Sequence, residues 1–103
     1  MNKQTAIRDV LVSSDYRPDF AGWLNEHWPI YLEFERMAMF AHKQGRTRLS
    51  AKFIFEMIRW NTAIREDGPY KLNGNFSADC ARLVVHQHPD LSGLFEFRAR
   101  LAA

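Results

Sequence analysis

Proline and glycine residues divide the chain after residue 28 into three stretches, each with apolar residues at helical spacing. In the first stretch, Pro29 fits the opening turn of a helix and Gly45 fits the left-handed position that ends one. The apolar residues between them share one helix face: Ile30, Phe34, Met37, Ala38 and Ala41. The spacing therefore predicts an amphipathic helix from Pro29 to just before Gly45.

The second stretch begins at Ser50, a residue type common at helix N-caps, and ends before Gly68 and Pro69. Its spacing predicts one broad buried face: Phe53, Ile54, Met57, Ile58, Trp60, Asn61 and Ile64. The opposite side carries Lys52, Glu56, Arg59 and Ala63. Glu56 and Arg59 stand three residues apart, so we expect them to pair along the helix.

The third stretch follows a polar turn at residues 73–75 and ends at Pro89. Asn75 or Ser77 is predicted to cap a helix that runs to about His88. The predicted buried stripe consists of Phe76, Cys80, Leu83, Val84 and Gln87. The residues predicted to face solvent are Asp79, Arg82 and His86.

The two ends of the chain leave the element type open. Residues 6–14 suit a short helix or a strand, and residues 20–28 suit a short helix or a turn. Apolar and polar residues alternate over 94–101, which favours a short strand, with a last helical turn as the alternative. The sum is an all-α fold. We expect a compact domain of three to five helices, helix-turn-helix or winged-helix-like, with at most one short C-terminal β element.

A chain of 103 residues suits one hydrophobic core, so a single domain over residues 1–103 is expected. Residues 28–98 would form its helical core, and residues 1–27 an N-terminal extension of helix and turn. No apolar run reaches the length of a membrane span, and the first ten residues lack the apolar core of a signal peptide. Cys80 is the only cysteine, which is typical of a reducing compartment, so we expect a cytoplasmic protein.

No catalytic, metal or cofactor motif occurs in the sequence. The histidines and the cysteine lack zinc-site spacing, and no paired carboxylates or phosphate-binding loop can be found. Cys80 falls on an apolar stripe, where a free cysteine behaves as a small hydrophobe. We therefore expect a protein that is not an enzyme, binds no metal and needs no cofactor.

Basic residues gather around the second predicted helix and the start of the third. Between residues 42 and 59, five lysines and arginines stand against Glu56 alone. In a helix-turn-helix protein such residues hold phosphates and read base edges. The predicted DNA-binding or partner-binding residues are Arg46, Arg48, Lys52, Arg59, Asn73, Asn75, Ser77 and Arg82. The alternative is a solvated charged face with ordinary capping residues, and the long link between the last two helices argues against a tight helix-turn-helix.

A second set of residues favours a protein partner instead of DNA. Met39 and Phe55 fall at the edges of their predicted helices, and Trp23 and Trp28 lie in an acidic segment. Aromatic and methionine side chains beside charges are common at protein interfaces, although in a short chain they also serve as core. Homodimerisation and inhibition of a partner protein are the two forms of this hypothesis.

Several of these residues belong to a longer pattern. The run S-A-x-x-I-x-E-x-I-R-W starts at Ser50, Y-K-L-N-x-N starts at Tyr70, and A-R stands at residues 81–82 before a closing P…G-x-F-x-x-R at residues 89–98. This pattern resembles a family of small, largely uncharacterised bacteriophage and prophage proteins. The resemblance implies a non-enzymatic phage accessory protein that acts inside a bacterial host. Such proteins are DNA-binding regulators or inhibitors of host defence or replication complexes, anti-CRISPR proteins among them.

Overall fold

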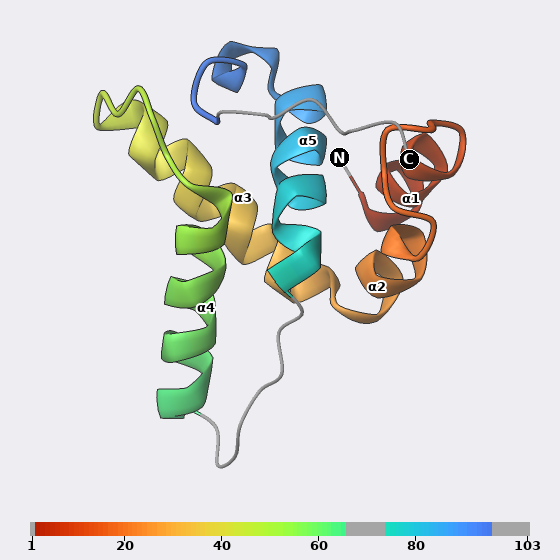
Figure 1. Cartoon of the computed structure of the whole chain (residues 1–103), viewed down its shortest axis with the longest axis horizontal. Coiled ribbons are helices and arrows are strands. Elements are labelled where there is room, and N and C mark those ends of the chain that lie inside the picture. The colour runs from red at the N-terminus through yellow and green to blue at the C-terminus, as the bar shows by residue number, and fades with distance from the viewer. Residues whose placement is uncertain (1, 66–73, 96–103) are drawn as a thin grey trace.

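The computed structural model describes residues 2–65 and 74–95, and the side chains of residues 2–61 and 75–95. Within these residues the fold is all-α, as predicted (Figure 1). Five α-helices follow one another: α1 Lys3–Leu11, α2 Phe20–Glu26, α3 Trp28–Lys43, α4 Ala51–Arg65 and α5 Ser77–Gln87. Two short 3₁₀ turns, η1 Gly74–Phe76 and η2 Pro89–Leu91, flank α5. The strand that was considered over residues 94–101 lies mostly outside the described residues.

The N-terminal residues form two helices that share the core with the rest of the chain. In α1, the side chain of Asn2 accepts a hydrogen bond from the backbone N–H of Thr5 at 2.8 Å, which satisfies one of the unpaired donors at the helix start. Helix α2 packs against α1 and α3. Both helices contribute buried side chains to the common core: Ala6, Val10, Phe20, Trp23 and Leu24.

Helix α3 begins and ends where its sequence predicts. Pro29 stands in its first turn. At the other end Gly45 takes the left-handed conformation with φ of 81°, and its N–H donates to the His42 carbonyl at 3.0 Å. The N–H of Arg46 donates to the Ala41 carbonyl at 3.1 Å, which completes a Schellman cap. The cap ends α3, and the chain then continues to α4.

Helix α4 buries a different face from the predicted one. Its start is as expected, because Ser50 Oγ accepts from the Phe53 N–H at 3.2 Å. Phe55, which was assigned to a helix edge, is only 1% exposed and faces the core with Ile54 and Ile58. The prediction was wrong for three apolar side chains that lie in solvent: Phe53, Met57 and Trp60.

Helix α5 has the predicted stripe with one important exception. Phe76, Cys80, Leu83 and Val84 are buried, as expected. Asp79 was predicted to face solvent but is 0% exposed, because the segment between α1 and α2 covers it. The half-buried Gln87 accepts a hydrogen bond from the Tyr31 hydroxyl at 2.7 Å, which joins α5 to α3.

The core contains a continuous series of aromatic rings that links five parts of the chain. Trp23 of α2 stacks on Phe76 of η1, with ring centroids 5.2 Å apart, and lies 6.0 Å from Phe55 of α4. Phe55 meets Phe34 of α3 edge-on at 5.8 Å, and Phe34 stacks on Phe95 at 5.8 Å. These offset and edge-on arrangements are the favourable ones for aromatic pairs. Phe55 therefore determines which face of α4 turns inward.

Two neighbouring phenylalanines on α4 provide a direct test of this packing. We expect Phe55→Ala to lower the free energy of unfolding by about 3–5 kcal/mol, because it leaves a cavity between Trp23 and Phe34. The matched variant Phe53→Ala should change it by no more than about 0.5 kcal/mol, because that ring is exposed. Urea denaturation followed by circular dichroism measures both values. Equal losses for the two variants would contradict the observed orientation of α4.

Candidate functional site

Three of the predicted binding residues lie together in solvent at the start of α4. Arg46 and Arg48 occupy the segment between α3 and α4, and Lys52 stands in the first turn of α4. All three side chains are exposed. None of the ion pairs among the described side chains includes them. They form a basic segment at one end of α4.

Further along α4, Arg59 is engaged with its own helix. Its Nη1 donates to Glu56 Oε1 at 2.9 Å, which confirms the pair expected from their spacing. Both side chains remain partly in solvent, at 41% and 63% exposure. Exposed pairs of this kind contribute only about 0.3–0.5 kcal/mol to a helix. This pair alone therefore adds little to the stability of α4.

The predicted binding residues around the start of α5 have different surroundings where the structure describes them. Asn73 lies outside the described residues, and Asn75 is exposed. Ser77 is buried, so it is not available to read a ligand as predicted; Phe76, the residue before it, packs on Phe20 and Trp23 and turns this end of α5 inward. The first turn of α5 thus serves packing.

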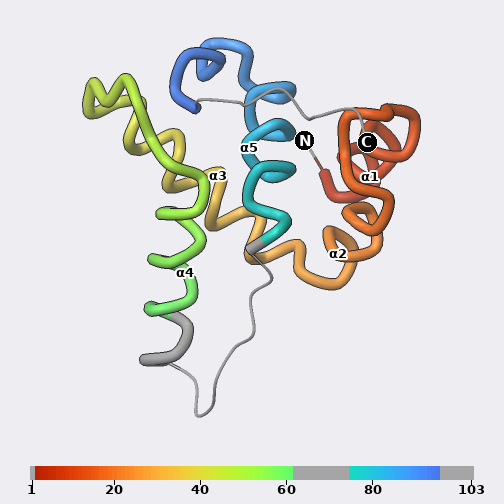
Figure 2. Tube along the Cα trace, in the orientation of Figure 1, coloured from red at the N-terminus to blue at the C-terminus, as the bar shows by residue number. Residues whose placement is uncertain are grey.

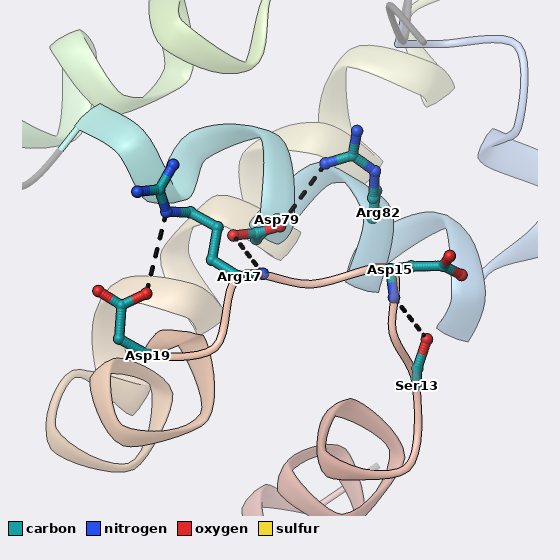
Figure 3. Close-up of polar contacts among 6 residues, drawn as sticks. All are labelled: Ser13, Asp15, Arg17, Asp19, Asp79 and Arg82. Atoms are coloured by element: carbon teal, nitrogen blue, oxygen red, sulfur yellow. Dashed lines mark hydrogen bonds and ion pairs between the residues drawn. The ribbon is translucent and has the colours of Figure 1, made fainter. Parts of the chain in front are cut away.

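Arg82 is directed toward the N-terminal half of the chain and away from α4. Its Nη1 lies 3.6 Å from the buried Asp79 Oδ1, and Asp79 Oδ2 accepts a hydrogen bond from the Arg17 N–H at 3.4 Å (Figure 3). Arg17 in turn extends its Nε to within 3.9 Å of Asp19. These contacts connect α5 to the segment between α1 and α2. The predicted basic residues therefore do not form one surface.

A shallow hollow of about 400 Å³ opens beside Arg82. Its lining comes from α1, the segment after it and α5: Asp9, Ser13, Asp15, Tyr16, Arg82, Val85 and His86. His86 Nε2 lies 3.4 Å from Asp9 Oδ2 across the hollow. Burial, followed by the charges of Asp15, Asp79 and Asp9, raises the pKa of Tyr16 to about 12. His86 and Arg82 in this lining already contact carboxylates, Asp9 and Asp79. The hollow is therefore best described as a polar contact between helices.

Among the described residues, three large apolar side chains lie exposed on the outward side of α4. Phe53, Met57 and Trp60 are 56%, 39% and 69% exposed, and we call these three residues the α4 outer face. They stand at positions i, i+4 and i+7, so they form one stripe along the helix. In the view of Figure 1, α4 lies at the edge of the molecule. Figure 2 shows α4 and α1 on opposite sides of α5. Of the basic segment, Lys52 belongs to the same helix as the α4 outer face, and Arg46 and Arg48 lie in the segment that leads into it.

The single cysteine of the chain lies inside the core. Cys80 is fully buried, and burial, aided by the charge of Asp79, raises the pKa of its thiol well above the ordinary value. In the part of the chain described, no group of three or more metal-ligating side chains comes together, and no helix has the length and apolar character of a membrane span.

Comparisons with known proteins leave the site to be interpreted from its geometry. No family model matches the chain, and neither a curated protein nor a solved structure matches it.

The sequence contained a signal for the α4 outer face that the prediction did not use. Apolar residues over 53–60 occupy more of the helix circumference than the single stripe, about 100° wide, that a surface helix buries. Once Phe55 is assigned to the core with Ile54 and Ile58, Phe53 and Trp60 must point elsewhere. The burial of Asp79 has no comparable signal, because it depends on a backbone N–H that lies sixty-two residues away.

Removing the Asp79 carboxylate tests its role in joining α5 to the N-terminal half. Asp79→Ala removes the carboxylate that faces the Arg82 guanidinium. The charge of Arg82, whose side chain is only 20% exposed, then loses this counter-charge. We expect a loss of about 3 kcal/mol in the free energy of unfolding. The control Asp15→Ala removes an exposed carboxylate that lines the hollow beside Arg82 and should cost no more than about 0.5 kcal/mol. Similar values for both variants in urea denaturation would show that Asp79 has no such role.

The raised pKa of Tyr16 predicts a specific alkaline behaviour. The unfolded chain releases the tyrosine proton near pH 10 and the folded chain near pH 12, so the contribution of Tyr16 to stability is complete below pH 10 and is lost as the pH rises toward 12. Tyr16→Phe should therefore move the alkaline unfolding midpoint to higher pH and remove the tyrosinate absorbance step near pH 12. If Tyr16→Phe leaves the unfolding midpoint unchanged, and the absorbance step that it removes lies near pH 10 instead of pH 12, the burial of this hydroxyl is contradicted.

Proposed function

We propose that this protein acts by binding, without catalysis, and that the α4 outer face docks into an apolar groove of a partner protein. One observation carries the proposal: Phe53, Met57 and Trp60 are exposed in a single stripe. The spacing i, i+4, i+7 is that of the anchors of helices that bind in grooves. Tryptophan, phenylalanine and methionine are also enriched in protein interfaces, and tryptophan dominates their binding energy most often.

The exposed area is large enough to support binding. Aromatic side chains cover roughly 150–250 Å² each, so at these exposures the three residues leave on the order of 300 Å² of apolar surface in water. At about 25 cal/mol per Å², covering that surface contributes about 7 kcal/mol before the costs of association. Single exposed apolar residues need no explanation, but a contiguous stripe of this size on a small domain is typical of a binding site.

The charges next to the stripe describe the partner further. The basic segment, Arg46, Arg48 and Lys52, lies at the N-terminal end of α4 and would meet an acidic rim of the groove. In this proposal the groove with its acidic edge belongs to a host defence or replication complex, and this chain inhibits that complex by docking there. This is the second of the two roles that the resemblance to phage proteins implies.

DNA binding is the second candidate function, and the exposed basic segment is the observation that favours it. Three cations at one end of a helix can hold phosphates. The burial of Ser77 and the contact of Arg82 with Asp79 remove the support for α5 as a recognition helix, so binding to DNA would rely on the N-terminal end of α4.

Alanine variants of two exposed aromatic residues distinguish docking by the α4 outer face from non-specific hydrophobic binding. Trp60→Ala should reduce the recovery of a partner from bacterial lysate at least tenfold, because it removes the largest anchor. Phe40→Ala is the matched control: Phe40 is 60% exposed on α3 but stands outside the stripe, and its loss should leave recovery unchanged. The measurement is quantitative mass spectrometry of material captured on the tagged protein.

The same preparations test the alternative. If the two aromatic variants recover the same proteins in equal amounts, the docking proposal is contradicted. Retention on duplex DNA that falls with salt and with Lys52→Ala, but not with Trp60→Ala, would then favour the nucleic-acid function.

A further inference from the structure

We infer that the first partner of the α4 outer face is a second copy of this chain, with the two α4 helices antiparallel about a two-fold axis at Met57. The inference rests on the proposed function, since it takes the α4 outer face to be a docking surface. It adds the identity of an occupant and a means of regulating the same site.

The positions of the anchors are self-complementary under such an axis. Phe53 lies four residues before Met57 and Trp60 lies three residues after it. An antiparallel pair centred at Met57 therefore brings Phe53 of one copy opposite Trp60 of the other, and the contact occurs twice. Symmetric dimers use one patch on both subunits in this way.

The charges beside the stripe are self-complementary as well. Glu56 lies one residue before Met57 and Arg59 two residues after it, and their 2.9 Å ion pair places both on the same flank of α4. In an antiparallel pair each flank meets the same flank of the other helix with its order reversed. Glu56 of one copy then lies within about one residue of Arg59 of the other, which gives two symmetric ion pairs. A parallel pair would instead set this flank against the opposite one and lose the match.

Lys52 stands on the same flank and lies about three residues from Arg59 of the other copy, so this like-charge approach weakens the dimer, although it is more distant than the Glu56–Arg59 contacts. Lys52 lies five residues before Met57, so the two copies of Lys52 are about 15 Å apart along the helix axis, at about 1.5 Å per residue. That separation exceeds the screening length of about 10 Å in moderate salt. Arg46 and Arg48 precede Lys52 in the chain and fall toward the ends of the pair.

The size of the surface implies a weak dimer. The apolar stripe, on the order of 300 Å², is well below the roughly 800 Å² that each partner buries in a stable interface. We therefore expect association that depends on concentration, in the micromolar range. A dimer of this strength keeps the stripe covered when the protein is alone and releases it to a partner that binds more tightly.

Exchanging the charges at residues 56 and 59 tests both the partner and the register. Glu56→Arg leaves three cations and no anion on the flank, Lys52 among them, and Arg59→Glu leaves two anions beside Lys52. Sedimentation equilibrium should show that each variant alone dimerises at least tenfold more weakly than the unaltered chain, and that an equimolar mixture of the two regains dimerisation, because each cationic flank then meets an anionic one. The double variant Glu56→Arg with Arg59→Glu should also dimerise. Phe40→Ala should not change association, and Trp60→Ala should abolish it.

Each other result overturns the inference in an identifiable way. An unaltered chain that stays monomeric to millimolar concentration excludes the second copy. Single charge variants that dimerise normally, with unchanged circular dichroism, exclude the antiparallel register. Neither result touches the proposed function, which fails only if Trp60→Ala and Phe40→Ala recover the same partner proteins in equal amounts.

Discussion

The position of Phe55 between Trp23 and Phe34 is the contact on which the rest of the structure depends. It joins α4 to α2 and α3 in a ring series that continues to Phe76 and Phe95. A small domain has few residues with which to close a core, and aromatic side chains bury the most apolar area for each position used. With this ring in the core, the opposite face of α4 points outward, so its apolar residues Phe53, Met57 and Trp60 lie in solvent.

The electrostatic arrangement divides the molecule into two sides. On one side, the buried Asp79 joins Arg82 and the Arg17 backbone, so that this part of α5 is committed to holding the N-terminal half. A buried carboxylate needs such partners, because leaving it without them would cost several kcal/mol. On the other side, the basic segment takes part in none of the ion pairs found among the described side chains. Cations that look equivalent in the sequence therefore have different uses.

Helix α4 combines two tasks that most surface helices keep apart. Its inner face closes the core, and its outer face offers Phe53, Met57 and Trp60 to solvent. Because the two faces share one rigid helix, a partner that covers the outer face meets anchors already held in position, and little conformational entropy is lost on binding. The adjacent Glu56–Arg59 pair supplies charges of both signs, which in the proposed contact would add specificity to an otherwise apolar surface.

Local chemistry determined where α3 begins and ends and where α4 begins. It did not determine the start of α5, where Phe76 stands at the N-cap in place of the predicted Asn75 or Ser77 and no side chain caps the helix. Pro29, Gly45, Ser50 and Pro89 act through their own backbones or through bonds to residues a turn away, so their effects can be predicted from the sequence, as can the buried stripe of α5 with its single apolar arc. Only the tertiary structure decided which face of α4 is buried and that Asp79 is inside. Periodicity cannot choose between two apolar arcs on one helix. That choice depends on rings from α2 and α3, and the burial of a carboxylate depends on a donor from a distant segment.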